Sequence, residues 1–227
     1  MNPHQAAYIA HLESLVTPAR LQTINQRLAL RTRWICPVLE DVYQLHNTSA
    51  AVRSCDAFGI QDLHVIEQRF GKKVEREIAL GSQKWVDVYR HAQPEAALQQ
   101  LRAQGYRIAA TTPHGDALPI DQVDLSQPIA VCFGTEKEGI SDTLLQAADL
   151  RVYIPMYGFA ESLNVSVAAS IILQQWGHRL RQSDVAWALS ASDAMDIRQR
   201  WLEHSIPSIG AIKARFIHEH QLHPQAL

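Results

Sequence analysis

Three segments of the chain hold the kinds of polar side chain that enzymes use to bind ligands or to stabilise charge. They span residues 47–59, 134–139 and 154–166. Each follows a run of apolar residues, and each contains small residues that let a backbone turn sharply or approach a ligand closely. We expect the chemistry of the protein to reside in these segments.

The first segment places one arginine, Arg53, among small and apolar residues of an expected helix. Arg53 has two interpretations. It either forms a surface ion pair, for instance with Asp56, or grips a phosphate group, whose geometry the planar guanidinium fits. His46 lies just before this segment and is a candidate base, although the pattern does not demand one.

The second segment has Gly134 and Gly139 on either side of Glu136. It matches neither the G-x-G-x-x-G pattern nor the Walker pattern, so it predicts neither a Rossmann nor a P-loop nucleotide site. Taken alone, the two glycines are also what a tight turn from a strand to a helix requires.

The third segment offers Ser162, Asn164 and Ser166 around the start of an expected helix, with apolar residues between them. One such residue would be enough to cap the helix. The excess of polar side chains points to a site as well as a cap.

Strands alternate with helices at short spacing through most of the chain, which favours an α/β fold with a mostly parallel sheet flanked by helices. The apolar runs predict strands at 34–39, 63–66, 86–89, 106–112, 129–133 and 150–154. The spacing and capping signals predict helices at 47–58, 94–104, 141–148, 162–181, 185–204 and 209–220, and helical structure over most of the first 30 residues. Since ligands bind beyond the carboxyl ends of parallel strands, the three polar segments are expected to meet there.

The bulk composition indicates a globular protein with 47% hydrophobic and 19% charged residues over 227 positions. No run approaches the roughly 18 apolar residues of a membrane span, and the first residues lack a signal-peptide pattern, so we expect a cytoplasmic protein without a membrane partner. The three cysteines form no C-x-x-C pair, which argues against a zinc site. We expect a helical extension at 1–33, a core at 34–181 and a helical tail at 182–227.

The amino-terminal segment is basic, although the whole chain has a net charge of −2. Phosphate contacts need local positive charge, not a positive total. Against a single acid, Glu13, the segment carries Arg20, Arg27, Arg31 and Arg33. These arginines are candidates for binding RNA, the alternative being ordinary solvated helix faces.

Together the three polar segments resemble the SpoU family of the SPOUT class of RNA methyltransferases. The family's first motif, N-x-x-A-x-x-R-x-x-x-A-x-G, is filled by Asn47, Ala50, Arg53, Ala57 and Gly59. The second, G-x-E-x-x-G after a strand, is matched by Gly134, Glu136 and Gly139. The third, I-P-M-x-G-x-x-x-S-L-N-V-S, is matched without a gap over residues 154–166. The resemblance covers residues 34–181.

The resemblance implies the SPOUT fold, in which the carboxyl-terminal part of the core forms a deep trefoil knot, a rare exception to unknotted topology. It also implies a homodimer and S-adenosyl-L-methionine as cofactor, bound in the knot. By position, the cofactor-binding residues carry over to Thr111, Gly134, Ile154 and Leu163. The helical flanks are similar to those of members that act on guanosine 18 of the tRNA D-loop, so tRNA is the expected partner and DNA is not.

The implied reaction transfers a methyl group from a sulfonium to a ribose 2′-hydroxyl, and no metal is needed. The resemblance makes Arg53 the catalytic residue, as a base or as a cation that stabilises the developing alkoxide; an arginine stays protonated, which favours the second role. Asn47 would orient Arg53 or the substrate, and Glu136 would hold the loop or the arginine. Ser162 and Asn164 would position the ribose.

Three alternatives remain open at this point. The first is a 2′-O-methyltransferase of ribosomal RNA, although residues 1–33 look too short for the extra RNA-binding domain that such relatives carry. The second is a catalytically inactive RNA-binding protein, against which Arg53, Glu136 and Asn164 are all present. The third is a methyltransferase that acts on a protein or a small molecule.

Overall fold

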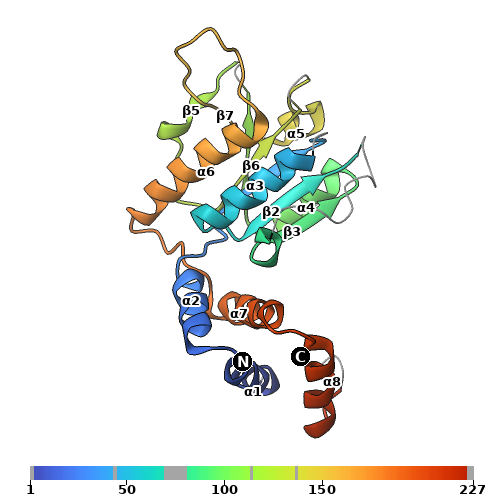
Figure 1. Ribbon diagram of the computed structural model, residues 1–227. Helices are drawn as coiled ribbons and strands as arrows, with labels where there is room; N and C mark the ends of the chain where they lie inside the picture. The colour runs from blue at the N-terminus through green and yellow to red at the C-terminus, as the bar shows by residue number, and fades with distance from the viewer. Residues whose placement is uncertain (1–2, 43–44, 69–80, 113–114, 136–137, 224–227) are drawn as a thin grey trace. The chain divides into compact units, whose positions relative to one another are not determined.

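The computed structural model describes residues 3–42, 45–68, 81–112, 115–135 and 138–223. The chain divides into two compact units (Figure 1). One consists of residues 1–31 and 188–227, and the other of residues 32–187. No helix within the described residues is long and apolar enough to cross a membrane.

The larger unit is built on a sheet of seven strands, and every pair of neighbouring strands is parallel. The strand order is β3-β2-β1-β6-β4-β7-β5. The strands are β1 (Ile35–Glu40), β2 (Asp62–Ile66), β3 (Asp87–His91), β4 (Arg107–Thr111), β5 (Leu118–Pro119), β6 (Ile129–Phe133) and β7 (Leu150–Tyr153). The central strands β1 and β6 are buried along their whole length, which explains why their sequences are nearly continuous apolar runs.

Helices cover both faces of this sheet (Figure 1). Helices α3 (Leu45–Phe58) and α6 (Val165–Arg181) pack on one face, and α4 (Pro94–Ala103) and α5 (Asp142–Ala147) on the other. Two short 3-10 helices, η1 (Ser82–Lys84) and η2 (Ile120–Gln122), complete the unit. The alternating pattern of strands and helices therefore produces the three-layer α/β architecture expected from the sequence.

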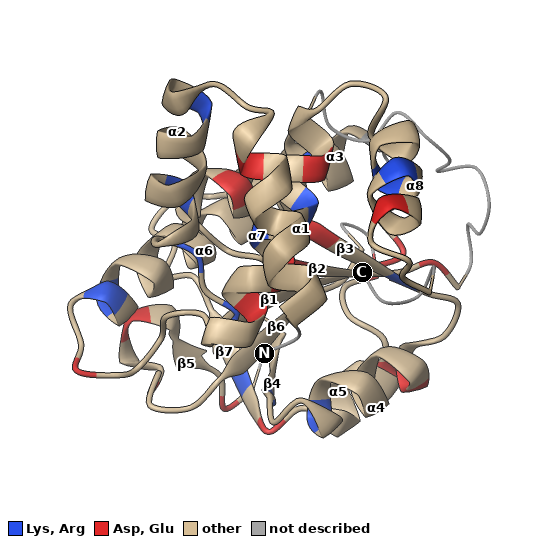
Figure 2. Ribbon diagram, turned by 90° about the horizontal axis from the view of Figure 1, so that it is seen from below, with Lys and Arg blue, Asp and Glu red and all other residues tan. Residues whose placement is uncertain are grey.

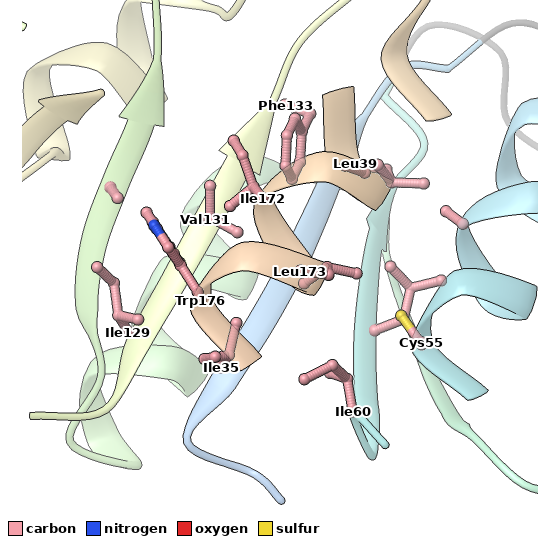
Figure 3. Close-up of a cluster of buried hydrophobic side chains, with 14 of the residues drawn as sticks. Ile35, Leu39, Cys55, Ile60, Ile129, Val131, Phe133, Ile172, Leu173 and Trp176 are labelled. Carbon is pink, nitrogen blue, oxygen red and sulfur yellow. The ribbon is translucent and has the colours of Figure 1, made fainter. Parts of the chain in front are cut away.

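The larger core cluster lies under α6, whose residues 172, 173 and 176 point at the sheet (Figure 3). Trp176 is fully buried, and its indole N–H donates to the carbonyl of Ile120 at 2.9 Å. A buried tryptophan needs such a partner. This cluster fixes α6 against β1 and β6, so the loop before α6 is anchored at its carboxyl-terminal end.

Helix α3 begins at Leu45, two residues before the expected start at 47, so Asn47 lies inside this helix. Two other helix starts differ from the expected positions by more than one residue, and capping explains both. Helix α6 begins at Val165, not at residue 162, because the side chain of Asn164 accepts from the backbone N–H of Ser166 as its N-cap. Helix α7 (Ala191–Ser205) begins six residues later than expected at 185, with Ser190 as its N-cap. Strand β5 has only two residues and was not expected from the sequence.

The smaller unit is helical and combines both ends of the chain. It contains α1 (Pro3–Ser14), α2 (Pro18–Leu28), α7 and α8 (Ile209–Glu219). An ion pair joins Glu13 of α1 to Arg198 of α7 at 2.6 Å, and the ring of Tyr8 packs on Phe216 with centroids 5.0 Å apart. Helices from opposite ends of the sequence thus stabilise one another.

Candidate functional site

The strands that precede the polar segments are close neighbours in the sheet. The first segment lies in α3, which follows β1, and the second follows β6, the neighbour of β1. The third follows β7, which is separated from β6 only by β4. Because all these strands are parallel, the polar segments lie at the same edge of the sheet, where open α/β folds bind ligands.

A hydrogen bond links the first and third segments directly. The side chain of Asn164 donates through Nδ2 to Oδ1 of Asn47 at 3.1 Å. Its own Oδ1 accepts from the backbone N–H of Ser166 at 3.0 Å and from the Ser166 hydroxyl at 2.6 Å. Asn47 is buried and Asn164 is exposed. Asn164 is therefore both the cap of α6 and a bridge to α3.

Arg53 lies in the second half of α3, and its side chain is exposed. The next residue, Ser54, forms a second link to α6, because its hydroxyl lies 2.7 Å from that of Ser170. Asn47–Asn164 and Ser54–Ser170 together fix α3 against α6 at two points along their length. The backbone around Arg53 is thus held in position, while its side chain is exposed.

The second segment forms a tightly closed loop. The backbone N–H of Thr135 donates to the carbonyl of Gly139 at 2.8 Å, and the reverse bond is 3.0 Å long. A Cβ atom at Gly134 would lie 2.0 Å from the Gly139 carbonyl oxygen, and Gly139 has a φ of +71°. Both positions therefore require glycine. Glu136, the acid expected to act here, lies outside the described residues.

Glu40, at the carboxyl end of β1, is a site residue that the sequence analysis did not predict. Its side chain is buried, and Oε2 accepts from the backbone N–H of Ser141 at 2.8 Å. Ser141 is the N-cap of α5 and directly follows the glycine loop. Glu40 therefore holds the second segment to β1. An acid at the end of a buried apolar strand was the available signal, since buried acids need a partner.

Three of the four residues expected to hold the cofactor lie at the ends of three adjacent strands, and the fourth, Leu163, lies just before α6. Thr111 ends β4, and its hydroxyl donates to the carbonyl of Cys132 in β6 at 2.9 Å. Ile154 follows β7, and Leu163 precedes α6; both are half-buried. With Gly134 after β6, these positions offer backbone amides and carbonyls next to apolar side chains. That combination suits the base and ribose of a nucleoside.

The four amino-terminal arginines do not share one environment. Arg20 and Arg27 of α2 are exposed, and Figure 2 shows basic residues on α2. Arg31 is buried, and its guanidinium lies 4.9 Å from the centroid of the Trp201 ring. Arg33 belongs to the larger unit and forms ion pairs with Asp62 and Asp87.

Arg33 is therefore bound within the protein. Burial is the largest single influence and disfavours its charge, but Asp62, Tyr89 and Asp87 together outweigh burial and raise the pKa of Arg33 above its usual range. Tyr106 also donates to the Arg33 carbonyl. These placements differ from the expectation of four arginines open to a ligand, because Arg31 and Arg33 use their cations in contacts inside the chain.

Comparison with known proteins connects this site to one family. The family model described as the SpoU rRNA Methylase family matches residues 35–174. A tRNA (guanosine(18)-2′-O)-methyltransferase of Borreliella burgdorferi is 34% identical over 193 residues, which cover 85% of this chain and 88% of the relative. The enzyme of the same name from Thermus thermophilus is 40% identical over 157 residues, 69% of this chain and 81% of the relative.

A solved structure has a similar fold over most of the chain. It is a TrmH/SpoU tRNA modifying enzyme of A. aeolicus, with a TM-score of 0.74 and 31% identity. The match covers 83% of this chain and 97% of that one. It therefore extends beyond the residues that carry the three motifs.

Proposed function

Because the chain belongs to the SpoU rRNA Methylase family, we propose that it transfers a methyl group from S-adenosyl-L-methionine to the 2′-hydroxyl of guanosine 18 in tRNA. The relatives that span most of the chain carry this activity in their names. The observation that carries the proposal is the Asn47–Asn164 hydrogen bond. It joins two motifs of the family in one place, on the helix that also carries Arg53.

Arg53 has the central role in this mechanism. When bound, S-adenosyl-L-methionine supplies an electrophilic methyl group on a sulfonium. The remaining difficulty is the weakly acidic ribose hydroxyl. An arginine is never deprotonated in proteins, so Arg53 stabilises the alkoxide that develops during transfer and binds the neighbouring phosphate, while the hydroxyl proton passes to solvent water. Its exposed position on α3 leaves room for an RNA strand.

The other polar residues position the reacting groups. Asn47 and Asn164 fix the relative placement of α3 and of the loop before α6. Ser162 is exposed two residues before the Asn164 cap, and we assign it to orienting the ribose. Glu136 is assigned to holding the glycine loop or Arg53. None of these roles requires a metal.

The methyl donor is assigned to the ends of β4, β6 and β7. Backbone groups at Thr111 and Gly134 would hold the adenine and ribose, with Ile154 and Leu163 packing against the ring. The closed geometry of the Thr135–Gly139 loop supports this role, since a fixed backbone provides donors and acceptors in constant positions.

The helical unit is assigned to binding tRNA through Arg20 and Arg27, whose side chains are exposed. Arg31 and Arg33 are assigned to structural contacts, with Trp201 and with Asp62 respectively. A tRNA substrate would place the protein in the cytoplasm.

We further propose a homodimer through α6. Ile172 and Leu173 of this helix are buried in the chain's own core, so a partner would have to cover other apolar residues of α6. Val167 and Ile171, one turn apart on α6, are 45% and 37% exposed. A second copy packing on this face would remove both from water.

The test is to incubate the purified protein with labelled S-adenosyl-L-methionine and unmodified tRNA transcripts, and to map the methyl group by nuclease digestion and mass spectrometry. We expect a 2′-O-methyl group on guanosine 18. The Arg53→Ala protein should lose about 100-fold or more in rate, and Arg53→Lys should recover only part. Because the family description names ribosomal RNA, ribosomal RNA is the second candidate; a methyl group found only there would replace the tRNA assignment.

A further inference from the structure

Two aromatic side chains project into solvent from the loop between β7 and α6. Tyr157 is 97% exposed and Phe159 is 107% exposed. The loop extends beyond the end of the sheet (Figure 1). Between them lies Gly158, where an added Cβ atom would meet no atom within 4 Å. Neither ring is packed against the chain, because both are almost fully exposed.

Isolated exposed apolar residues are ordinary on protein surfaces. This pair is different because both rings are almost fully in water and lie two positions apart in one loop. Phenylalanine and tyrosine bury large areas when they find a partner. Binding of a flat apolar partner to this loop would therefore be favourable, because it would remove both rings from water.

The position of the rings within the sequence suggests the partner. Both occupy places that the family motif I-P-M-x-G-x-x-x-S-L-N-V-S leaves open, so they are properties of this chain and not of the motif. Phe159 is three residues before Ser162, to which we assign the target ribose. Three extended residues span at most about 11 Å, and the five from Tyr157 to Ser162 at most about 18 Å. Phe159 therefore lies within reach of the nucleotide next to that ribose, and Tyr157 within reach of the following one.

We propose that Tyr157 and Phe159 form a stacking platform for unpaired nucleobases that flank the target nucleotide. This inference rests on the proposed RNA substrate. A ribose that enters an active site is drawn away from its helical neighbours, so adjacent bases lose their stacking partners. Aromatic side chains replace that stacking in proteins that bind single-stranded RNA, without a preference for one base.

A second copy of the chain is the competing occupant, and the structure favours RNA. Gly158 and Ala160, next to the rings in sequence, have very small side chains, and the almost complete exposure of both rings leaves their faces open to a planar partner. The partly exposed Val167 and Ile171 on α6 form a flatter helical face that suits another protein. The exposed Arg53 adds a cation for the phosphates of an approaching strand.

The experiment compares leucine and aromatic replacements. Tyr157→Leu and Phe159→Leu, singly and together, keep much of the apolar area but remove the ring faces. Phe159→Tyr is the matched control because it keeps a ring. For each protein, we would measure the Kd for an unmodified tRNA transcript and the KM and kcat for methyl transfer. The Kd for S-adenosyl-L-methionine and the mass by sedimentation would complete the set.

The proposal predicts that the double leucine variant weakens RNA binding and raises the RNA KM by between about fivefold and 100-fold. Its kcat at saturating RNA, its cofactor Kd and its mass should match the parent, and Phe159→Tyr should bind RNA normally. Unchanged RNA binding in the double leucine variant would overturn the platform. A loss of RNA binding that is accompanied by a lower molecular mass would also overturn it, because the rings would then bind a second copy of the chain. A loss accompanied by weaker cofactor binding would overturn it as well. If the parent protein binds tRNA without methylating it, the proposed reaction fails while the RNA Kd values still decide the platform.

Discussion

Asn164 donates to Asn47 across 117 positions of sequence, at 3.1 Å, while its own carbonyl oxygen caps α6. One amide thus serves two functions with its two ends. The N–H₂ end connects the third motif to the first, and the oxygen end starts the helix that anchors the loop. A residue with only donors or only acceptors cannot supply both functions at once.

The two functions of Asn164 can be separated by substitution. Asp is a good N-cap, so the free energy of unfolding of Asn164→Asp should lie within about 1 kcal/mol of the parent's. This variant lacks the side-chain N–H that donates to Asn47. Asn164→Ala loses both and should also lose about 1 kcal/mol of stability. Both variants should transfer methyl groups about 10- to 100-fold more slowly, because small displacements of reacting groups are costly. Denaturant unfolding and initial rates would check this, and an Asp variant with the parental rate would show that the bridge is dispensable.

Gly134→Ala should damage the cofactor site. The new Cβ would lie 2.0 Å from the Gly139 carbonyl oxygen and 2.2 Å from the Ile140 nitrogen, so the loop must open. We expect a loss of about 1–3 kcal/mol in stability and a loss of binding to S-adenosyl-L-methionine measured by calorimetry. Gly210→Ala is the control, since a Cβ there meets nothing within 4 Å. Parental cofactor affinity in Gly134→Ala would remove the glycine loop from the binding site.

A histidine pair, of which His64 is buried and His91 half-buried, should make the fold sensitive to acid. Nδ1 of His64 lies 2.9 Å from Nε2 of His91, and burial together with the His91 charge lowers the pKa of His64 from 6.5 to about 4. A histidine with a lowered pKa is stabilising when neutral. Its contribution is therefore complete above about pH 6.5 and is lost as the pH falls towards 4, by about 3 kcal/mol in all.

The measurement is the free energy of unfolding between pH 7.5 and 4.5, for the parent and for His64→Phe. The phenyl ring can keep the contact with Tyr89, whose ring centroid is 4.8 Å from that of His64. His64→Phe should flatten the pH dependence, whereas replacing the exposed His178 by glutamine should leave it unchanged. A His64→Phe protein with the parental slope would show that the acid sensitivity arises elsewhere.

Replacing Arg20 and Arg27 together by alanine should weaken tRNA binding without changing kcat. If each contacts one phosphate, the slope of log K against log salt should become about 2 units less steep. Arg102→Ala is the control, because that guanidinium is held by Asp149 at 3.0 Å. The measurement is the tRNA Kd of the parent and of both variants, determined by filter binding at several salt concentrations. An unchanged slope in the double variant would show that α2 does not contact RNA.

Local signals in the sequence predicted most of the sheet and its helices. The apolar runs of β1 and β6 were recognisable because these strands are buried along their whole length. Gly59 and Gly105 ended helices as expected, with φ values of +71° and +83°. The convergence of the first and third motifs also followed from parallel strands that end at one edge. These features depend on short stretches of chain or on a general rule of the fold.

Features that depend on distant partners could not be predicted. Nothing near Arg33 in sequence reveals Asp62 or Asp87, and nothing near Glu40 reveals the Ser141 amide. The association of α1 with α7 depends on contacts such as Glu13–Arg198, across 185 positions. The trefoil knot implied by the family resemblance stays a prediction.

The central claim is that the acceptor is the 2′-hydroxyl of guanosine 18 in tRNA. The most direct measurement uses two matched tRNA transcripts, one with guanosine and one with 2′-deoxyguanosine at position 18, and labelled S-adenosyl-L-methionine. The account predicts one methyl group per guanosine transcript and none on the deoxy transcript, with both bound to similar extents. Equal labelling of the two transcripts would contradict it, because the methyl group would then lie on another atom or another nucleotide.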